Sequence, residues 1–278
     1  MSTERPTVEC YPFNHFDIDT KRRDYEWSMS SLHYHASYEI YYLFEGTRKI
    51  LVQDRIYEIL PGDIVMFKPN IFHRSMSTGV HTRFNVEFSD SFLCEYFTAV
   101  TREQLLKCFD REWIRLTEAE NKEFYRLLSV LQAEYNGNGL FYITLAEMLK
   151  LLCEAADRPE LENANKEEHL SKATQKIQPV LSYISRNYAD IAAIDEIADA
   201  CYINKSYMCR LFKKEMGITV VDYLNNIKLQ QACELLRTTE DSLTEVALRC
   251  GFSGTSYFGQ QFKKSMGCTP SAFRRNKR

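Results

Sequence analysis

The sequence has no C-x-x-C pair and no short Cys/His cluster among its nine cysteines. Zinc knuckles need closely spaced thiolate and imidazole ligands, and small secreted domains need paired cysteines, so this pattern argues against both. No run of eighteen apolar residues is present, and residues 1–19 lack a charged and then apolar leader. We therefore predict a protein of the reducing cytoplasm without a membrane segment.

The chain has 278 residues, which is enough for two domains of ordinary size. Its formal net charge is only −3, but the charge is divided unevenly. Residues 172–278 contain sixteen basic and ten acidic side chains, whereas residues 1–171 carry a net charge of −9. A basic half is typical of a protein that binds a polyanion, because each lysine or arginine near a phosphate releases counterions. A basic surface that is merely solvated gives the same count.

Residues 31–88 have the pattern of strands. Short stretches rich in Tyr, Ile, Val and Phe are interrupted by turn sequences such as Glu45-Gly46 and Pro61-Gly62-Asp63. This spacing predicts an antiparallel sandwich or small barrel within about residues 1–90.

A helical period follows, over about residues 102–157. Thr117 and Glu120 have the spacing of a capping box, and leucines recur after them every three or four residues. Two amphipathic helices after a sheet can cover it, pair with the same helices of a second subunit, or do both. Residues 158–171 are charged, contain a proline and lack apolar periodicity, so we predict a linker between domains 1–157 and 172–278.

The last hundred residues contain an internal repeat. Ala198-x-x-Cys201 recurs as Ala247-x-x-Cys250, and Ser206-Tyr207 followed by Phe-Lys-Lys recurs fifty residues later at Ser256-Tyr257. Two copies are too few for a solenoid, which needs about three repeats or more. We predict an all-α domain of two small three-helix units joined by a helix over residues 220–239.

Each copy has the pattern of a helix-turn-helix. Gly251 supplies the positive φ that such a turn needs, and Asn204 and Ser253 are suitable N-caps for the second helices. Both second helices end in Phe-Lys-Lys, where the ring can pack inward and the lysines can reach phosphates. A plain helical domain with solvated lysines is the alternative, but repeat, turn chemistry and charge agree on DNA binding.

Residues 174–275 closely resemble the AraC/XylS family of bacterial transcription regulators. The second copy carries the more specific pattern, with Gly251-Phe252, Ser256-Tyr257-Phe258, Phe262-Lys263-Lys264 and Thr269-Pro270. The resemblance implies that both second helices enter the major groove on one face of the duplex. It places Ser206, Cys209, Arg210, Thr255, Ser256 and Gln260 at base edges, and Lys213, Lys214, Lys263 and Lys264 near phosphates. Tyr202 and Lys228 depart from the family pattern, which has a smaller residue and an arginine there.

The front half resembles the cupin double motif through His33-x-His35-x3-Glu39, Pro61-Gly62-Asp63 and His73. Odd-numbered residues share one face of a strand, so His33, His35, Glu39 and Tyr41 are expected to face inward. In cupin enzymes such a set (here His33, His35, Glu39 and His73) holds a divalent metal. Regulators of the resembled family commonly use the same barrel as a ligand sensor without metal. A set of satisfied core polar groups is the third interpretation.

We favour the ligand sensor. The predicted effector site consists of His33, His35, Glu39, Tyr41, His73, Arg83 and Asn85. The predicted fold is α+β, with a cupin-like antiparallel barrel and helical pair before the all-α double helix-turn-helix domain. Family analogy implies a DNA-binding activator, homodimeric, responsive to a small molecule such as a sugar or glycoside, and acting on RNA polymerase. We predict no catalytic residue and no cofactor. The alternative is a metal-dependent cupin enzyme fused to a DNA-binding domain.

Overall fold

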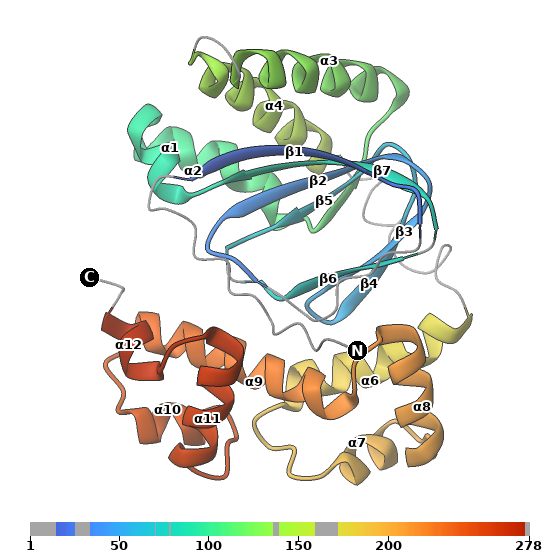
Figure 1. The fold of residues 1–278 in the computed structure, drawn as a ribbon, viewed down its shortest axis with the longest axis vertical. Coiled ribbons are helices and arrows are strands. Elements are labelled where there is room, and N and C mark those ends of the chain that lie inside the picture. The colour runs from blue at the N-terminus through green and yellow to red at the C-terminus, as the bar shows by residue number, and fades with distance from the viewer. Residues whose placement is uncertain are drawn as a thin grey trace.

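The structure is a computed structural model that describes residues 15–25, 34–69, 71–77, 79–135, 139–158 and 172–275. Its first half contains two antiparallel sheets that face each other in a barrel-like sandwich, as predicted (Figure 1). The strand order is β1-β7-β2-β5-β8 in the larger sheet and β4-β3-β6 in the smaller. The strands are β1 Phe16–Arg23, β2 Tyr38–Glu45, β3 Arg48–Val52, β4 Arg55–Ile59, β5 Asp63–Phe67, β6 His73–Ser77, β7 His81–Phe88 and β8 Trp113–Arg115.

The turn between β2 and β3 requires a glycine. Gly46 has φ +85°, and a Cβ added there would overlap the backbone carbonyl of Val80. A side chain at this position would therefore be strained by its backbone conformation and would collide with the neighbouring loop. This close approach sets the start of β3, and with it the register of Arg48 against Ser77 in β6.

The two faces of β2 contact different layers, because successive side chains of a strand point to opposite sides. Tyr42 packs its ring against Phe124 of the covering helices, with 5.1 Å between ring centroids. Glu39, by contrast, reaches His73 on the opposite sheet. Odd-numbered residues of β2 therefore face the barrel interior, as the strand parity predicts.

Helices cover the outer face of the larger sheet (Figure 1). Thr117 and Glu120 form the predicted capping box, with their side chains bonded to each other's backbone N–H. The predicted helical region, about 102–157, was too late at its start: it missed α1 and the first residues of α2, and it includes strand β8, which pairs with β5. These helices are α1 Asp90–Tyr96, α2 Ala99–Leu105, the 3-10 helix η1 Leu106–Asp110, α3 Glu118–Tyr135 and α4 Phe141–Ala156.

The C-terminal half is helical throughout its described residues, as predicted. The joining helix α9 ends at Thr238, one residue before the predicted end. The predicted linker 158–171 lies outside the described residues except for Arg158. The helices are α6 Lys172–Asn187, α7 Ile194–Ala200, α8 Lys205–Met216, α9 Val220–Thr238, α10 Leu243–Arg249, α11 Thr255–Met266 and α12 Pro270–Arg275.

The smaller sheet packs on the C-terminal helices, and the two share one apolar core (Figure 1). Leu51 of β3 and Met76 of β6 belong to this core together with Tyr223 of α9. The barrel contributes Tyr34, Leu51, Ile56, Phe72 and Met76 to it. The barrel half and the helical half are therefore joined by burial as well as by the chain.

Hydrogen bonds cross the same interface. The Tyr223 hydroxyl donates to the carbonyl of Gln53 at 2.8 Å, and the Gln178 amide donates to the carbonyl of Asp54 at 2.7 Å. Arg74 of β6 donates to the carbonyl of Met216 at the C-terminal end of α8. The turn between β3 and β4 is thus bonded to α6 and α9, and strand β6 to α8. No described helix is long and apolar enough to cross a membrane.

Candidate functional site

The second helices of the two repeat units, α8 and α11, have the same pattern of exposure. Residues 211–220 and 261–270 match position by position in buried, half-buried and exposed side chains. Of the six predicted base-facing residues, Cys209 is half-buried and the others are exposed: Ser206, Arg210, Thr255, Ser256 and Gln260. The apolar anchors Phe212 and Phe262 are fully buried. Each unit therefore presents one polar helix face while the other face packs inward.

The turns before these helices differ in their strain. Gly251 has φ +72°, and a Cβ there would overlap the carbonyl of Ala189, so the predicted need for glycine is confirmed. Tyr202 occupies the matching turn with φ 52°, and 99% of its side-chain surface is exposed. Left-handed backbone is unfavourable for a bulky residue, and the Tyr202 ring gains no burial in return.

The N-caps also differ. Asn204 caps α8 as predicted, because its side chain accepts a hydrogen bond from the Tyr207 N–H at 3.1 Å. The prediction for Ser253 was wrong: the N-cap of α11 is Gly254, which has no side chain to bond the free N–H groups. The extra residue in the second turn moves the serine one position away from the helix start.

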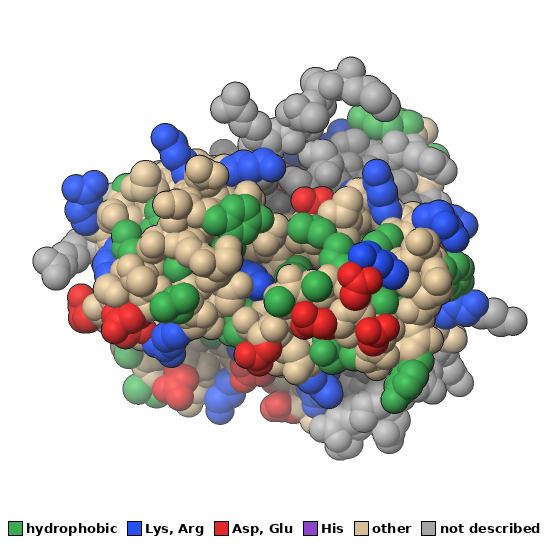
Figure 2. All heavy atoms as spheres, turned by 90° about the horizontal axis from the view of Figure 1, so that it is seen from below, with side chains coloured by type: hydrophobic (Ala, Val, Ile, Leu, Met, Phe, Trp, Pro, Cys, Tyr) green, Lys and Arg blue, Asp and Glu red, His purple; other side chains and the backbone are tan. Residues whose placement is uncertain are grey.

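The four predicted phosphate-contacting lysines lie in the last turns of α8 and α11. Lys213, Lys214, Lys263 and Lys264 are all exposed. Positive charge at a helix C-terminus is also favourable for the helix itself, which gives these lysines a structural role as well. In the view of Figure 2, basic side chains lie mostly near the margin of the face, with both uncharged and acidic side chains between them.

Lys228 of α9 joins the two repeat units. Its ammonium donates to the carbonyl of Ile191 at 3.2 Å, before α7, and to the carbonyl of Gly251 at 2.8 Å, in the second turn. Only 6% of the residue is exposed, and burial lowers the pKa of its ammonium. One buried cation therefore fixes the position of one unit relative to the other.

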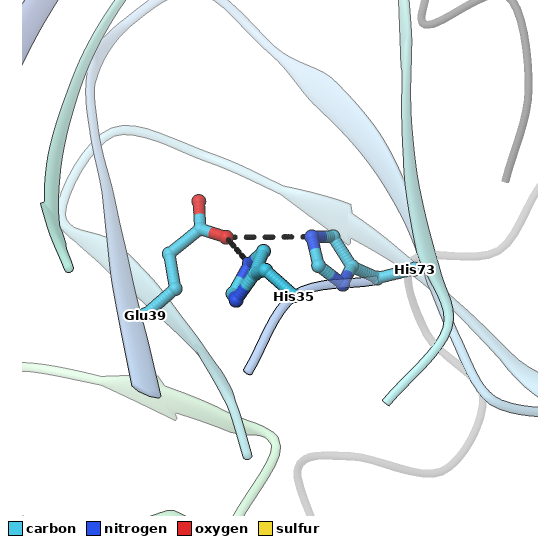
Figure 3. Close-up of side chains that lie close together, drawn as sticks. All are labelled: His35, Glu39 and His73. Carbon is cyan, nitrogen blue, oxygen red and sulfur yellow. Dashed lines mark hydrogen bonds and ion pairs between the residues drawn. The ribbon is translucent and has the colours of Figure 1, made fainter. Parts of the chain in front are cut away.

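The barrel interior holds a buried cluster of His35, Glu39 and His73 (Figure 3). His35 Nε2 lies 2.9 Å from Glu39 Oε2, and His73 Nε2 lies 3.3 Å from the same oxygen. One ligand atom from each residue can be chosen so that all three lie within 4.8 Å of one another. The fourth predicted member, His33, lies outside the described residues.

The other ring nitrogen of each histidine contacts the backbone. His35 Nδ1 lies 3.0 Å from the carbonyl of Ser37, and His73 Nδ1 lies 2.9 Å from the carbonyl of Ile71. A carbonyl only accepts, so each Nδ1 carries a proton, and each Nε2 can donate to Glu39 only when the ring is doubly protonated. Burial alone would lower the pKa of His35, but its hydrogen bond and attraction to Glu39 raise it. Burial favours the neutral form of Glu39, but hydrogen bonds from His35 and His73 hold its pKa well below the usual value.

The remaining predicted pocket residues surround this cluster. The Asn85 amide on β7 donates to Glu39 Oε1. Arg83 pairs with Asp19 of β1 at 2.9 Å, and its guanidinium lies 5.9 Å from the ring centroid of Tyr41. Six of the seven predicted effector residues therefore lie within one polar barrel interior, five on inward faces of strands and His35 in the segment before β2.

Sequence reasoning missed Arg48 and Ser75, which belong to the same interior. Arg48 is 1% exposed and its Nε donates to the Ser75 hydroxyl at 3.1 Å. Ser75 has the same odd parity as His73 on β6, and Arg48 has the even parity of the buried Ile50 and Val52 on β3. The signal in the sequence was an arginine at an inward-facing strand position next to a turn. It was overlooked because Arg48 is not part of the cupin motif.

Two family comparisons cover most of the chain. Residues 15–173 match the family described as AraC-like ligand binding domain, and residues 197–276 match the helix-turn-helix domain family. The chain belongs to the AraC family of transcription regulators. It is therefore a DNA-binding transcription regulator, in which the helix-turn-helix domain implies binding to DNA and the ligand-binding domain implies a small-molecule effector.

Relatives of this AraC-family chain extend along nearly its whole length. The transcriptional activator RhaR of Mannheimia succiniciproducens is 24% identical over 262 residues, covering 92% of this chain and 91% of the relative. The transcriptional activator RhaS of Escherichia coli O9:H4 is 22% identical, covering 88% of this chain and 87% of the relative. Among solved structures, the C-terminal domain of AraT from Geobacillus stearothermophilus is 31% identical, covers 39% of this chain and 88% of its own, and has a TM-score of 0.36.

Proposed function

We propose that this AraC-family regulator is a homodimeric, one-component activator of the cytoplasm that responds to a small polar effector bound inside its barrel. The observation that carries this proposal is the shared smaller sheet. His73 and Ser75 of β6 face the barrel interior, while Arg74 and Met76 of the same strand face the C-terminal helices. An effector that prefers one position of β6 therefore prefers one position of α8.

The chemistry of the interior favours a hydroxyl-rich effector such as a sugar or glycoside. Arg83 and Asn85 offer hydrogen-bond donors beside the ring of Tyr41. A site that binds a sugar needs the same two features, polar groups for the hydroxyls and an aromatic ring for stacking. The names of the full-length relatives support activation, and an activator acts through RNA polymerase.

A thermal-shift screen of sugars against the full chain tests the effector. The sugar that stabilises the protein should lose its effect on Arg83→Ala, because a ligand raises stability only through its own binding. Arg126→Ala is the control, since Arg126 pairs with Glu123 on the exposed face of α3. Stabilisation that persists in Arg83→Ala would show that the ligand binds elsewhere.

DNA reading is tested on the duplex that the full chain selects from a random pool. Arg210→Ala should lose about 1–3 kcal/mol on that duplex and relax the preference at one base pair. Lys263→Ala should weaken all duplexes alike and reduce the slope of log affinity against log salt by about 0.9. Identical behaviour of the two variants across a set of altered duplexes would contradict the division into base and phosphate contacts.

A divalent metal in the barrel is a second candidate, favoured by the fixed histidine tautomers. When both rings are neutral, two Nε2 lone pairs and a carboxylate converge, and backbone carbonyls orient both rings, as around metal ligands. Without an added proton or cation the lone pairs and the carboxylate repel one another. The metal content of purified protein decides: Glu39→Gln should remove bound metal and Arg83→Ala should not. If protein purified without chelator still lacks metal, the remaining interpretation is a protonated histidine–glutamate cluster.

A further inference from the structure

Two cysteines meet where η1 packs on α4, away from the barrel interior and the reading helices. Cys108 of η1 is fully buried, and Cys153 of α4 is half-buried. Their sulfur atoms contact the same carbonyl oxygen, that of Leu105, at 3.3 Å and 3.4 Å. The packing of a 3-10 helix against a long helix therefore holds two thiols side by side that are far apart in the sequence.

The two thiols differ in reactivity. The neighbouring Cys108 thiol can donate to the Cys153 thiolate and lowers the pKa of Cys153 to about 7, whereas the same pairing and burial raise the pKa of Cys108 well above its usual value. The thiolate is the reactive form of cysteine, and only Cys153 is reachable from solvent. This asymmetry matches a pair in which one thiol is attacked first and the other resolves the product.

We propose that Cys108 and Cys153 form a reversible disulfide when the protein meets a hydroperoxide. The Cys153 thiolate attacks the terminal peroxide oxygen, the O–O bond breaks, and the alkoxide leaves and takes up a proton. The sulfur of Cys108 then attacks the resulting sulfenic acid, the S–O bond breaks, and water leaves with the thiol proton. The two sulfurs supply the two electrons that reduce the peroxide, and a dithiol reductant reverses the reaction.

The bond would tie η1 to α4 and thereby fix the segment that follows η1. Glu112 in that segment accepts hydrogen bonds from the Tyr57 hydroxyl at 2.6 Å and the Gln53 amide at 3.1 Å. The carbonyl of Gln53 in turn accepts from Tyr223 of the DNA-binding half. The segment after η1 is thus connected through two hydrogen bonds, Glu112 to Gln53 and Gln53 to Tyr223, to the interface between the two halves.

The experiment uses the full chain, reduced, freed of reductant and treated with hydrogen peroxide while folded. Peptide mass mapping should find the Cys108 peptide joined to the Cys153 peptide, and dithiothreitol should separate them. The rate should rise with pH through about 7 and then level off, following the Cys153 thiolate. Cys94→Ser is the matched control, because Cys94 is an exposed thiol of α1, and it should leave the linked peptide unchanged.

Two variants test the order of the steps. In Cys108→Ser, Cys153 should stop at the sulfenic acid, which dimedone labels. In Cys153→Ser, Cys108 should stay unlabelled because it is buried and protonated. Failure of the folded wild-type chain to form the linked peptide would overturn the proposal. Dimedone labelling of Cys108 in Cys153→Ser would overturn the assignment of the attacking thiol.

Discussion

At the scale of single residues, the two turns of the repeat share a left-handed backbone conformation but differ in the space available for a side chain. Gly251 has no room for a Cβ, whereas Tyr202 carries a full side chain in solvent. Gly251→Ala should therefore destabilise the protein by about 2 kcal/mol or more, from the positive φ and the overlap with Ala189. Denaturant unfolding of the full chain measures this loss.

Gly259 provides the matched control for that substitution. It lies inside α11, has no positive φ, and a Cβ there would meet nothing within 4 Å. Gly259→Ala should stabilise the protein by about 0.5–1 kcal/mol, because alanine loses less backbone entropy in a helix. Equal effects of the two alanines would mean that the turn geometry does not limit stability.

The sequence predicted Gly251 and Asn204 correctly because each acts within a few residues of itself. A turn glycine and an N-cap are local features, and local chemistry specifies them. Ser253 failed because one inserted residue moved the helix start, and element boundaries depend on packing that a sequence pattern does not contain. The inward positions of Glu39 and Tyr41 were predicted from strand parity and His73 was chosen through the cupin resemblance, whereas Arg48 required knowledge of which face of β3 turns inward.

At the scale of elements, α9 acts as the connection between two repeat units through Lys228. Lys228→Met keeps most of the side-chain volume but removes both hydrogen bonds, leaving the carbonyls of Ile191 and Gly251 without this donor. We expect a loss of about 2–4 kcal/mol, since hydrogen bonds to charged groups are stronger than neutral ones.

The variant should also weaken binding to the selected duplex, because the two reading helices would no longer keep one spacing. Lys228→Arg is the informative comparison, since the family pattern has arginine there. It should retain most of the stability and of the DNA affinity. A Lys228→Met chain with unchanged stability but weakened DNA binding would contradict a structural role for this cation.

Short elements outside the repeat were the ones that the sequence did not predict in full. Helices α1 and α2 have seven residues each, and β8 has three. Such lengths contain too few periods to distinguish a helix from a loop, and β8 is a strand because β5 offers it a partner. The long helices α3, α4 and α9 were predicted because their apolar positions repeat over several turns.

At the scale of the whole molecule, Arg74 connects the barrel to the C-terminal end of α8. It is 5% exposed, and burial lowers the pKa of its guanidinium to about 10. Arg74→Met keeps the apolar part of the side chain and removes the bond to Met216. It should cost about 1.5–3 kcal/mol and separate the unfolding of the two halves into two calorimetric transitions.

Arg22→Ala is the control for this prediction, because Arg22 is exposed and pairs with Asp24 and Glu45 on the barrel surface. Surface ion pairs contribute little, so its unfolding should match that of the wild type. A single transition in Arg74→Met, at the wild-type temperature, would show that the apolar core alone couples the halves.

The core shared across the smaller sheet also limits how this protein can be recombined. A chimera that joins this sensor to the DNA-binding half of another regulator must bury Leu51 and Met76 against a new helical surface. Cutting within 158–171 would divide the chain there, but Leu51, Met76 and the face of α9 that packs on them would become exposed to solvent. We therefore expect a chimera to fold only when the β3–β6 face and the helices that cover it come from the same protein.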